Sequence, residues 1–271
     1  MRGDMQRGFL ERPDCRLYYE VTGSGPFLVF AHGLGGNHLS WWQQVPHFAA
    51  RYTCVTFAHR GFAPSSAPPN GPDPAAYLAD LTALIDHVGA TDVRIVAQSM
   101  GGWSALAFAF AQPQRTRALV MASTGGDLAW PSLDRDRLTR WRHDSDATAN
   151  DLFARGLHPA SGARMAREQP AMDHLYRAID ALSLSLDKQA LRARLLAALT
   201  RPVGTLRTLK VPTLWLTGAE DCAFPPFVAE LLAPMMPKAL LAGVKDAGHS
   251  VYFERPDVFN SVVGEFLEAN R

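Results

Sequence analysis

Short apolar runs alternate along the chain with longer segments of helical period. The buried-strand candidates are residues 27–30, 93–97, 117–121, 213–217 and 239–242. Continuous apolar runs of this kind are typical of parallel strands that are covered on both faces. The helical candidates are residues 75–88, 102–111, 226–234 and 256–269. Strand–helix alternation predicts an α/β protein with a mostly parallel sheet and helices on both faces, to which the more polar segment 16–21 adds an edge strand.

One long segment breaks this alternation. Between about residues 127 and 206 the chain has no buried-strand pattern, and its leucines from Leu182 to Leu196 are spaced for helices with an apolar face. We therefore predict a helical insertion here. The proline-rich stretch 63–76 is typical of a surface loop.

Composition and charge exclude several classes of protein. A chain of 271 residues with 47% hydrophobic and 20% charged residues can bury a sizeable core, and it is neither disordered nor a coiled coil. Its 27 basic and 26 acidic residues give a net charge of +1, which offers no electrostatic footprint for nucleic acid or an anionic membrane.

Targeting and metal signals are equally sparse. The segment 1–12 has no apolar signal region, and no apolar run is long enough to span a bilayer, so we expect a soluble cytoplasmic protein. The three cysteines are far apart and form no CxxC pair, and there is no HExxH motif. We therefore predict no disulfide framework, no metal and no cofactor.

The sharpest chemical motif is the segment 96–102, VAQSMGG, which joins a strand candidate to a helix candidate. A G-x-S-x-G elbow holds its serine in a strained conformation above the sheet, and small residues on either side let strand and helix pack closely. Here Ala97 stands at the first glycine position and Gly101 at the second. We predict Ser99 as a nucleophile, with a serine that caps the following helix as the alternative.

A serine nucleophile needs a base that a third group holds in place. Asp221 follows the strand candidate 213–217, and His249 follows the last strand candidate, so both lie at carboxyl ends of strands, where parallel sheets bind ligands. We predict that Asp221 orients His249 and stabilises its imidazolium. Glu220 is the alternative acid, and a histidine satisfied by local hydrogen bonds is the structural alternative for His249.

A glycine-rich turn, HGLGG at 32–36, follows the first buried strand. Acyl transfer builds negative charge on a carbonyl oxygen, and backbone N–H groups aimed at that oxygen lower the barrier. We predict the N–H groups of Leu34 and Met100 as the two oxyanion donors. A dinucleotide-binding fingerprint fails because His38 stands where the third glycine is required.

The order and spacing of these motifs resemble the α/β-hydrolase superfamily over about residues 9–270. The segment 59–65, HRGFAPS, is similar to the family's D-x-R-G-x-G-x-S segment, with Ala58 and Ala63 at the usual aspartate and glycine. The segment 248–256, GHSVYFERP, is similar to the usual ending after the catalytic histidine.

This resemblance implies an α/β-hydrolase fold, with an eight-stranded, mostly parallel sheet and a helical cap inserted after strand six. The cap then corresponds to residues 127–206, and the core domain to residues 1–126 and 207–271. Position by position, the resemblance implies the same nucleophile, base, acid and oxyanion donors as the residues themselves indicate.

The identity of the nucleophile narrows the chemistry. Haloalkane dehalogenases and epoxide hydrolases of this superfamily carry aspartate at the elbow, whereas Ser99 favours an acyl-serine intermediate that water hydrolyses with His249 as the base. The chain resembles enol-lactonases, small carboxylesterases and C–C bond hydrolases. We expect hydrolysis of an ester, lactone or related acyl bond in a small, mostly apolar molecule. A C–C bond hydrolase and a non-enzymatic ligand receptor that retains the triad stay open as alternatives; the sequence does not indicate an oligomeric state.

Large side chains near these motifs are candidates for the substrate pocket. They are Trp103, Trp130, Trp141 and Val251. The alternative for Trp130 and Trp141 is that they anchor cap helices on the core. Arginines at 135, 137, 140 and 142 are candidates to meet a substrate carboxylate, with a solvated helix face as the alternative.

Overall fold

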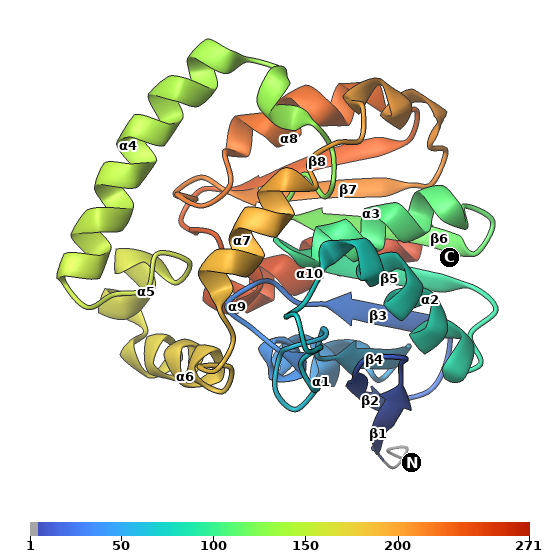
Figure 1. The fold of residues 1–271 in the computed structure, drawn as a ribbon. Coiled ribbons are helices and arrows are strands. Elements are labelled where there is room, and N and C mark those ends of the chain that lie inside the picture. Colours follow the sequence, from blue (N-terminus) through green and yellow to red (C-terminus); the bar gives the residue numbers. More distant parts are fainter. Residues whose placement is uncertain (1–4) are drawn as a thin grey trace.

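A computed structural model describes residues 5–271 and contains one eight-stranded sheet, in the order β1-β2-β4-β3-β5-β6-β7-β8 (Figure 1). The strands are β1 Gln6–Glu11, β2 Arg16–Thr22, β3 Phe27–Ala31, β4 Thr53–Phe57, β5 Val93–Gln98, β6 Thr116–Ala122, β7 Thr213–Gly218 and β8 Ala239–Val244. β2 pairs antiparallel with both β1 and β4, and the remaining pairs are parallel. The predicted mostly parallel sheet is confirmed.

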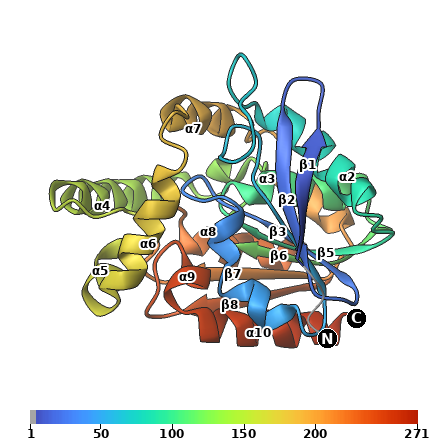
Figure 2. The ribbon, with the colours of Figure 1, turned by 90° about the horizontal axis from the view of Figure 1, so that it is seen from below.

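Helices cover both faces of this sheet, and others lie at the ends of its strands. The helices of the described residues are α1 Gln44–Phe48, α2 Tyr77–His87, α3 Gly101–Ala111, α4 Arg135–Ala154, α5 Gly162–Glu168, α6 Pro170–Ala181, α7 Lys188–Ala197, α8 Pro226–Leu232, α9 Val251–Glu254 and α10 Pro256–Ala269. One apolar cluster contains residues of α2, α3 and α8, and a second contains residues of α1, α9 and α10. Figure 2 accordingly shows α10 across the sheet from α2 and α3.

The central strands alternate between these two clusters. In β3, Val29 and Ala31 pack with α2 and α3, whereas Leu28 and Phe30 pack with α1 and α10. Each central strand therefore buries both sets of its side chains, which explains why its sequence is a continuous apolar run.

Two predictions about the edges of the sheet were wrong. The predicted edge strand 16–21 lies in β2 and is not at the edge, because β1 pairs with its outer side. The run 239–242 is not buried: Leu240 and Leu241 in β8 are 58% and 46% exposed. Within residues 5–271, β8 pairs only with β7 and forms the edge of the sheet, and no further element covers these leucines. The apolar pattern of the sequence also failed to predict β1, β4, α1 and α9; β4 interrupts its apolar pattern with threonines.

Helices α4 to α7 lie between β6 and β7 in sequence and occupy the side of the molecule where the parallel strands end (Figure 1). The two ends of this insertion meet. The Ala129 N–H donates to the carbonyl of Arg201, the Arg201 N–H donates to that of Asp127, and the Arg201 guanidinium lies 2.7 Å from the Asp127 carboxylate. On this contact we propose residues 127–206 as the cap, with the rest of the chain as the core.

The longest described helix, α4, has 20 residues and is rich in charged side chains. Within residues 5–271, no helix combines the length and the apolar character that a membrane span requires.

Candidate active site

Ser99 lies at the turn between β5 and α3, with a backbone φ of +50°. This left-handed region is unfavourable for a residue with a side chain and marks a turn that its surroundings hold in place. Gly101 explains the tight turn, because a Cβ there would collide with the carbonyl oxygen of Ala31 in β3. Gly102 is constrained in the same way by Thr124. At the first small position, Ala97 is fully buried, so its methyl group fits between sheet and helix.

The glycine-rich turn at 32–36 packs directly against this elbow. A Cβ at Gly33 would lie 3.0 Å from the Ser99 Cβ and would collide with the Gln98 side chain. Among the residues that the structure describes, neither the Leu34 N–H nor the Met100 N–H donates a hydrogen bond to another protein group. Met100 also stands at the amino end of α3, where the helix dipole favours negative charge. The two N–H groups remain available to a ligand oxygen beside Ser99.

Asp221 and His249, which are 28 residues apart in sequence, meet in the fold. The Nδ1 atom of His249 lies 3.0 Å and 2.9 Å from the two carboxylate oxygens of Asp221. The Oδ1 atom of Asp221 also accepts the N–H groups of Ala223 and Phe224, each at 2.8 Å. Both side chains of the pair are buried. The carboxylate is thus fixed by its own loop and leaves the Nε2 atom of His249 to act on a neighbouring group.

The serine and histidine segments are adjacent but are not directly bonded through their side chains. The Gln98 side-chain amide donates to the His249 carbonyl at 3.2 Å and so ties the elbow to the histidine loop. Within residues 5–271, no hydrogen bond joins the Ser99 hydroxyl to the His249 ring. Contacts of this kind are often long in the absence of substrate and shorten when substrate binds.

Glu220, the alternative acid, points elsewhere. Its carboxylate is 41% exposed and forms an ion pair with Arg164 of α5, whose Nε lies 3.0 Å from Oε2. Asp246 also faces Arg164, at 3.7 Å. The structure therefore places Asp221, and not Glu220, on the histidine.

Glu254, the last residue of α9, has a position in the site that the sequence motifs did not single out. Its carboxylate is buried and accepts the N–H groups of Gly248, at 2.9 Å, and Ser250, at 3.3 Å. Burial raises the pKa of Glu254 to about 7. The signal in the sequence is an acidic residue within the otherwise apolar run that follows His249.

The candidate pocket residues lie in different surroundings. Trp103 is partly buried and packs, together with Leu34, against an apolar cluster that contains Met100. The other members of this cluster are Ala58, Phe62, Tyr77, Leu191 and Leu195, and Leu186 also packs against it. Trp130 packs edge-on against Phe224, with ring centroids 5.5 Å apart, and Trp141 packs against the same core. Val251 is buried in the cluster on the opposite face of the sheet.

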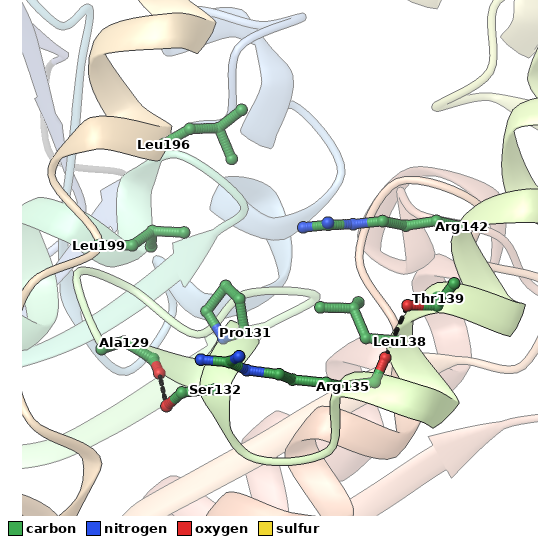
Figure 3. Close-up of a pocket in the computed structure, with 9 residues that line it drawn as sticks. All are labelled: Ala129, Pro131, Ser132, Arg135, Leu138, Thr139, Arg142, Leu196 and Leu199. Atoms are coloured by element: carbon green, nitrogen blue, oxygen red, sulfur yellow. Dashed lines mark hydrogen bonds between the residues drawn. The ribbon is translucent and has the colours of Figure 1, made fainter.

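A cavity of about 580 Å³ lies between the turn 129–132, α4 and the end of α7 (Figure 3). Arg135 and Arg142 extend into it beside Leu138, Leu196 and Leu199. Ser99, Asp221 and His249 do not line it. Arg137 is turned away: it lies 3.3 Å from Glu230 and covers the ring of Phe227. Of the four arginines considered above, two therefore face this cavity.

No group of three or more histidine, cysteine or acidic side chains within residues 5–271 is arranged to hold a metal ion. The arrangement around Ser99 resembles a site for acyl transfer. It combines a strained serine, two N–H groups that are available to a ligand oxygen, and a histidine held by a carboxylate.

Known proteins show the same architecture. The model of the alpha/beta hydrolase fold family matches residues 26–256. A protein of Mycobacterium tuberculosis with the provisional name non-heme bromoperoxidase BpoC is 27% identical, over 93% of this chain and 97% of its own length. A protein of Azorhizobium caulinodans with the provisional name carbamate hydrolase RutD is 26% identical, over 92% of this chain and 94% of its own.

Solved structures of hydrolases superpose on nearly the whole chain. An esterase from Thermogutta terrifontis has a TM-score of 0.77 at 24% identity, and covers 97% of this chain and 98% of its own. An enol-lactonase from Burkholderia xenovorans LB400 has a TM-score of 0.73 at 23% identity, and covers 96% of this chain and 100% of its own. At these identities the likeness establishes the fold alone. Together with the family match, it shows that the chain is an enzyme that belongs to the alpha/beta hydrolase fold family.

Proposed function

We propose that this protein is a serine hydrolase that cleaves an ester, lactone or related acyl bond of a small, mostly apolar molecule. The observation that carries the proposal is the pairing of His249 with Asp221 at 2.9 Å, beside a serine held at φ +50°. A serine hydroxyl becomes nucleophilic only where a base and an orienting acid are both in place.

The residues support a two-step reaction. His249 takes the proton of the Ser99 hydroxyl as the serine oxygen attacks the substrate carbonyl, and the N–H groups of Leu34 and Met100 stabilise the negative charge on that carbonyl oxygen. The proton then passes from His249 to the leaving alcohol, and an acyl-serine remains. Water attacks this ester while His249 takes its proton, and the carboxylic acid leaves as the proton returns to Ser99.

The surroundings of the two N–H groups favour an apolar substrate. Met100 belongs to the cluster that contains the buried leucines of α7, and Leu34 and Trp103 pack against it. An acyl chain or ring that places its carbonyl at these N–H groups would lie against this apolar wall. The esterase, enol-lactonase and carbamate hydrolase among the similar proteins all bear the names of acyl-bond hydrolases. Hydrolysis of a C–C bond would use the same serine, histidine and N–H groups. Assays on a panel of esters and lactones and on a C–C bond substrate would distinguish the two activities.

The first test is intact-mass analysis after reaction with a fluorophosphonate. We expect one adduct on the wild-type protein and none on Ser99→Ala, because only an activated serine attacks the phosphorus. Ser123→Ala is the matched control, since Ser123 also has a positive φ, of 49°, but is not at the elbow. This variant should keep the adduct. An unmodified wild type would contradict the proposal of a serine mechanism, and an adduct that survives in Ser99→Ala would contradict the choice of nucleophile.

A further inference from the structure

We propose that Glu254 is a positioning residue for His249, and that its buried carboxylate holds the histidine loop in the active arrangement only while it is ionised. The inference rests on the proposed function, in which His249 is the base. The observation that carries it is the pair of hydrogen bonds that Glu254 accepts from the residues on either side of the histidine.

The two bonds bracket His249. Oε2 of Glu254 accepts the Gly248 N–H at 2.9 Å, and Oε1 accepts the Ser250 N–H at 3.3 Å. Gly248 permits this approach, because a Cβ there would lie 3.2 Å from Oε1. Glu254 is 2% exposed and Ser250 is fully buried, so both bonds are shielded from bulk water. The orientation of the histidine backbone therefore depends on a carboxylate that does not itself touch the imidazole ring.

The fold returns Glu254 to this loop through the short helix α9. The N–H groups of Phe253 and Glu254 both donate to the Ser250 carbonyl, at 2.8 Å and 2.9 Å, and close the turn. From the cap, the side-chain amide of Gln169 donates to the Glu254 carbonyl at 2.9 Å. Glu168 of α5 binds the neighbouring Arg255, also at 2.9 Å. The backbone of Glu254 is thus anchored to the cap, and its side chain reaches the base loop.

The charges around Glu254 come from several elements. The pKa of Glu254 is raised to about 7, mainly by burial and to a smaller extent by Asp221, against the opposing effects of the two N–H donors and Arg255. Cys222 on the acid loop, Tyr176 on α6 and Tyr252 on α9 also lie within electrostatic range of this carboxylate. The attraction of Arg255 is thus smaller than the effect of burial, and the carboxylate changes charge near neutral pH.

Protonation has opposite effects on activity and on stability. A neutral carboxyl group presents an O–H where one of the two backbone N–H groups needs an acceptor, so the loop loses a bond as the pH falls below about 7. The folded state binds this proton more tightly than the unfolded chain, whose glutamate has the ordinary pKa of 4.5. The contribution of Glu254 to stability is therefore complete below about 4.5 and is lost as the pH rises to about 7. Over the same range, the aligned form of His249 becomes populated.

The test compares Glu254→Gln with wild type in pH profiles of kcat and KM for an ester substrate. The amide keeps the shape of the side chain but offers one acceptor and no charge. We expect kcat at pH 8 to fall on the order of ten-fold with little change in KM, since a charge-assisted bond to the loop is lost. In the wild type, we expect the slope of log kcat/KM against pH on the acidic side to be greater than one. In Glu254→Gln this slope should fall to one, as for a single titrating group.

Glu265→Gln is the matched control, because it removes an exposed carboxylate of α10 that binds Ser261 and does not touch the histidine loop. This control should keep the acidic slope of log kcat/KM that the wild type shows. Hydrogen exchange of the 247–250 amides supplies a readout that does not depend on catalysis, and Glu254→Gln should lose protection there. Unchanged kcat and slope in Glu254→Gln, or unchanged exchange, overturns the inference. If the wild type takes no fluorophosphonate, the proposed function fails and the exchange result alone decides whether Glu254 holds the loop.

Discussion

At the scale of single residues, the site depends on positions where only a small side chain fits. Ser99 adopts a left-handed backbone, and the two glycines after it let α3 approach β3 and the segment after β6. The family's usual glycine is Ala97 here, and its full burial shows that one methyl group is accommodated on the sheet side of the turn. The departure from the usual motif is therefore compatible with the geometry of the elbow.

Gly101→Ala tests this close packing. The added methyl group would collide with backbone and not with a flexible side chain, so we expect a loss of about 1–3 kcal/mol in the free energy of unfolding. Urea denaturation measures it. Gly204→Ala is the control, because a Cβ there meets nothing within 4 Å, and a change of less than about 0.5 kcal/mol is expected. Equal effects in the two variants would show that the contact with Ala31 is unimportant.

At the scale of elements, helix α7 has two different apolar faces. Leu191 and Leu195 are buried in the same cluster as Met100, whereas Leu196 is 55% exposed beside the cavity of Figure 3. The leucine pattern in the sequence predicts a helix here but does not distinguish these faces. Only the tertiary structure places the face of Leu191 and Leu195 beside Met100, whose N–H is one of the two proposed oxyanion donors.

Leu191→Ala separates the two faces of α7. Truncation of this buried leucine should lower the free energy of unfolding by about 2–5 kcal/mol and shift the preference for acyl-chain length, because a cavity opens beside Met100. Leu196→Ala, on the exposed face of the same helix, should change neither property much. Chemical denaturation and a series of p-nitrophenyl esters measure the two effects. A stability loss without any shift in chain preference would mean that the cluster only supports the fold.

At the scale of the whole molecule, the candidate site is assembled from three distant segments at one edge of the sheet. The serine follows β5, the aspartate follows β7 and the histidine follows β8. Parallel strands present their carboxyl ends on the same side, so turns that are far apart in sequence become neighbours. Helix α5 of the cap then contacts the acid loop through Arg164 and Glu220, and the Glu254 segment through Glu168 and Arg255.

Asp221→Asn tests this assembly. An amide cannot stabilise the imidazolium and favours the wrong tautomer of His249, so kcat should fall by about three to four orders of magnitude. Glu220→Gln removes the neighbouring carboxylate, which binds Arg164 and not the histidine, and kcat should stay within about three-fold of wild type. Steady-state kinetics on an ester decides between them. The reverse ranking would make Glu220 the acid.

The amino-acid sequence by itself determined the fold class, because buried parallel strands leave continuous apolar runs and the elbow and glycine-rich turn leave local motifs. It also predicted Ser99, Asp221 and His249 as one site, from their places after strand candidates; their catalytic roles stay predictions. Tertiary structure alone decided which strands form the edges: within residues 5–271 no further element covers the apolar sequence of β8, and β1 pairs beside β2. It alone turned Glu220 toward Arg164 and brought Glu254 under the histidine loop, because orientation and burial depend on contacts between segments distant in sequence.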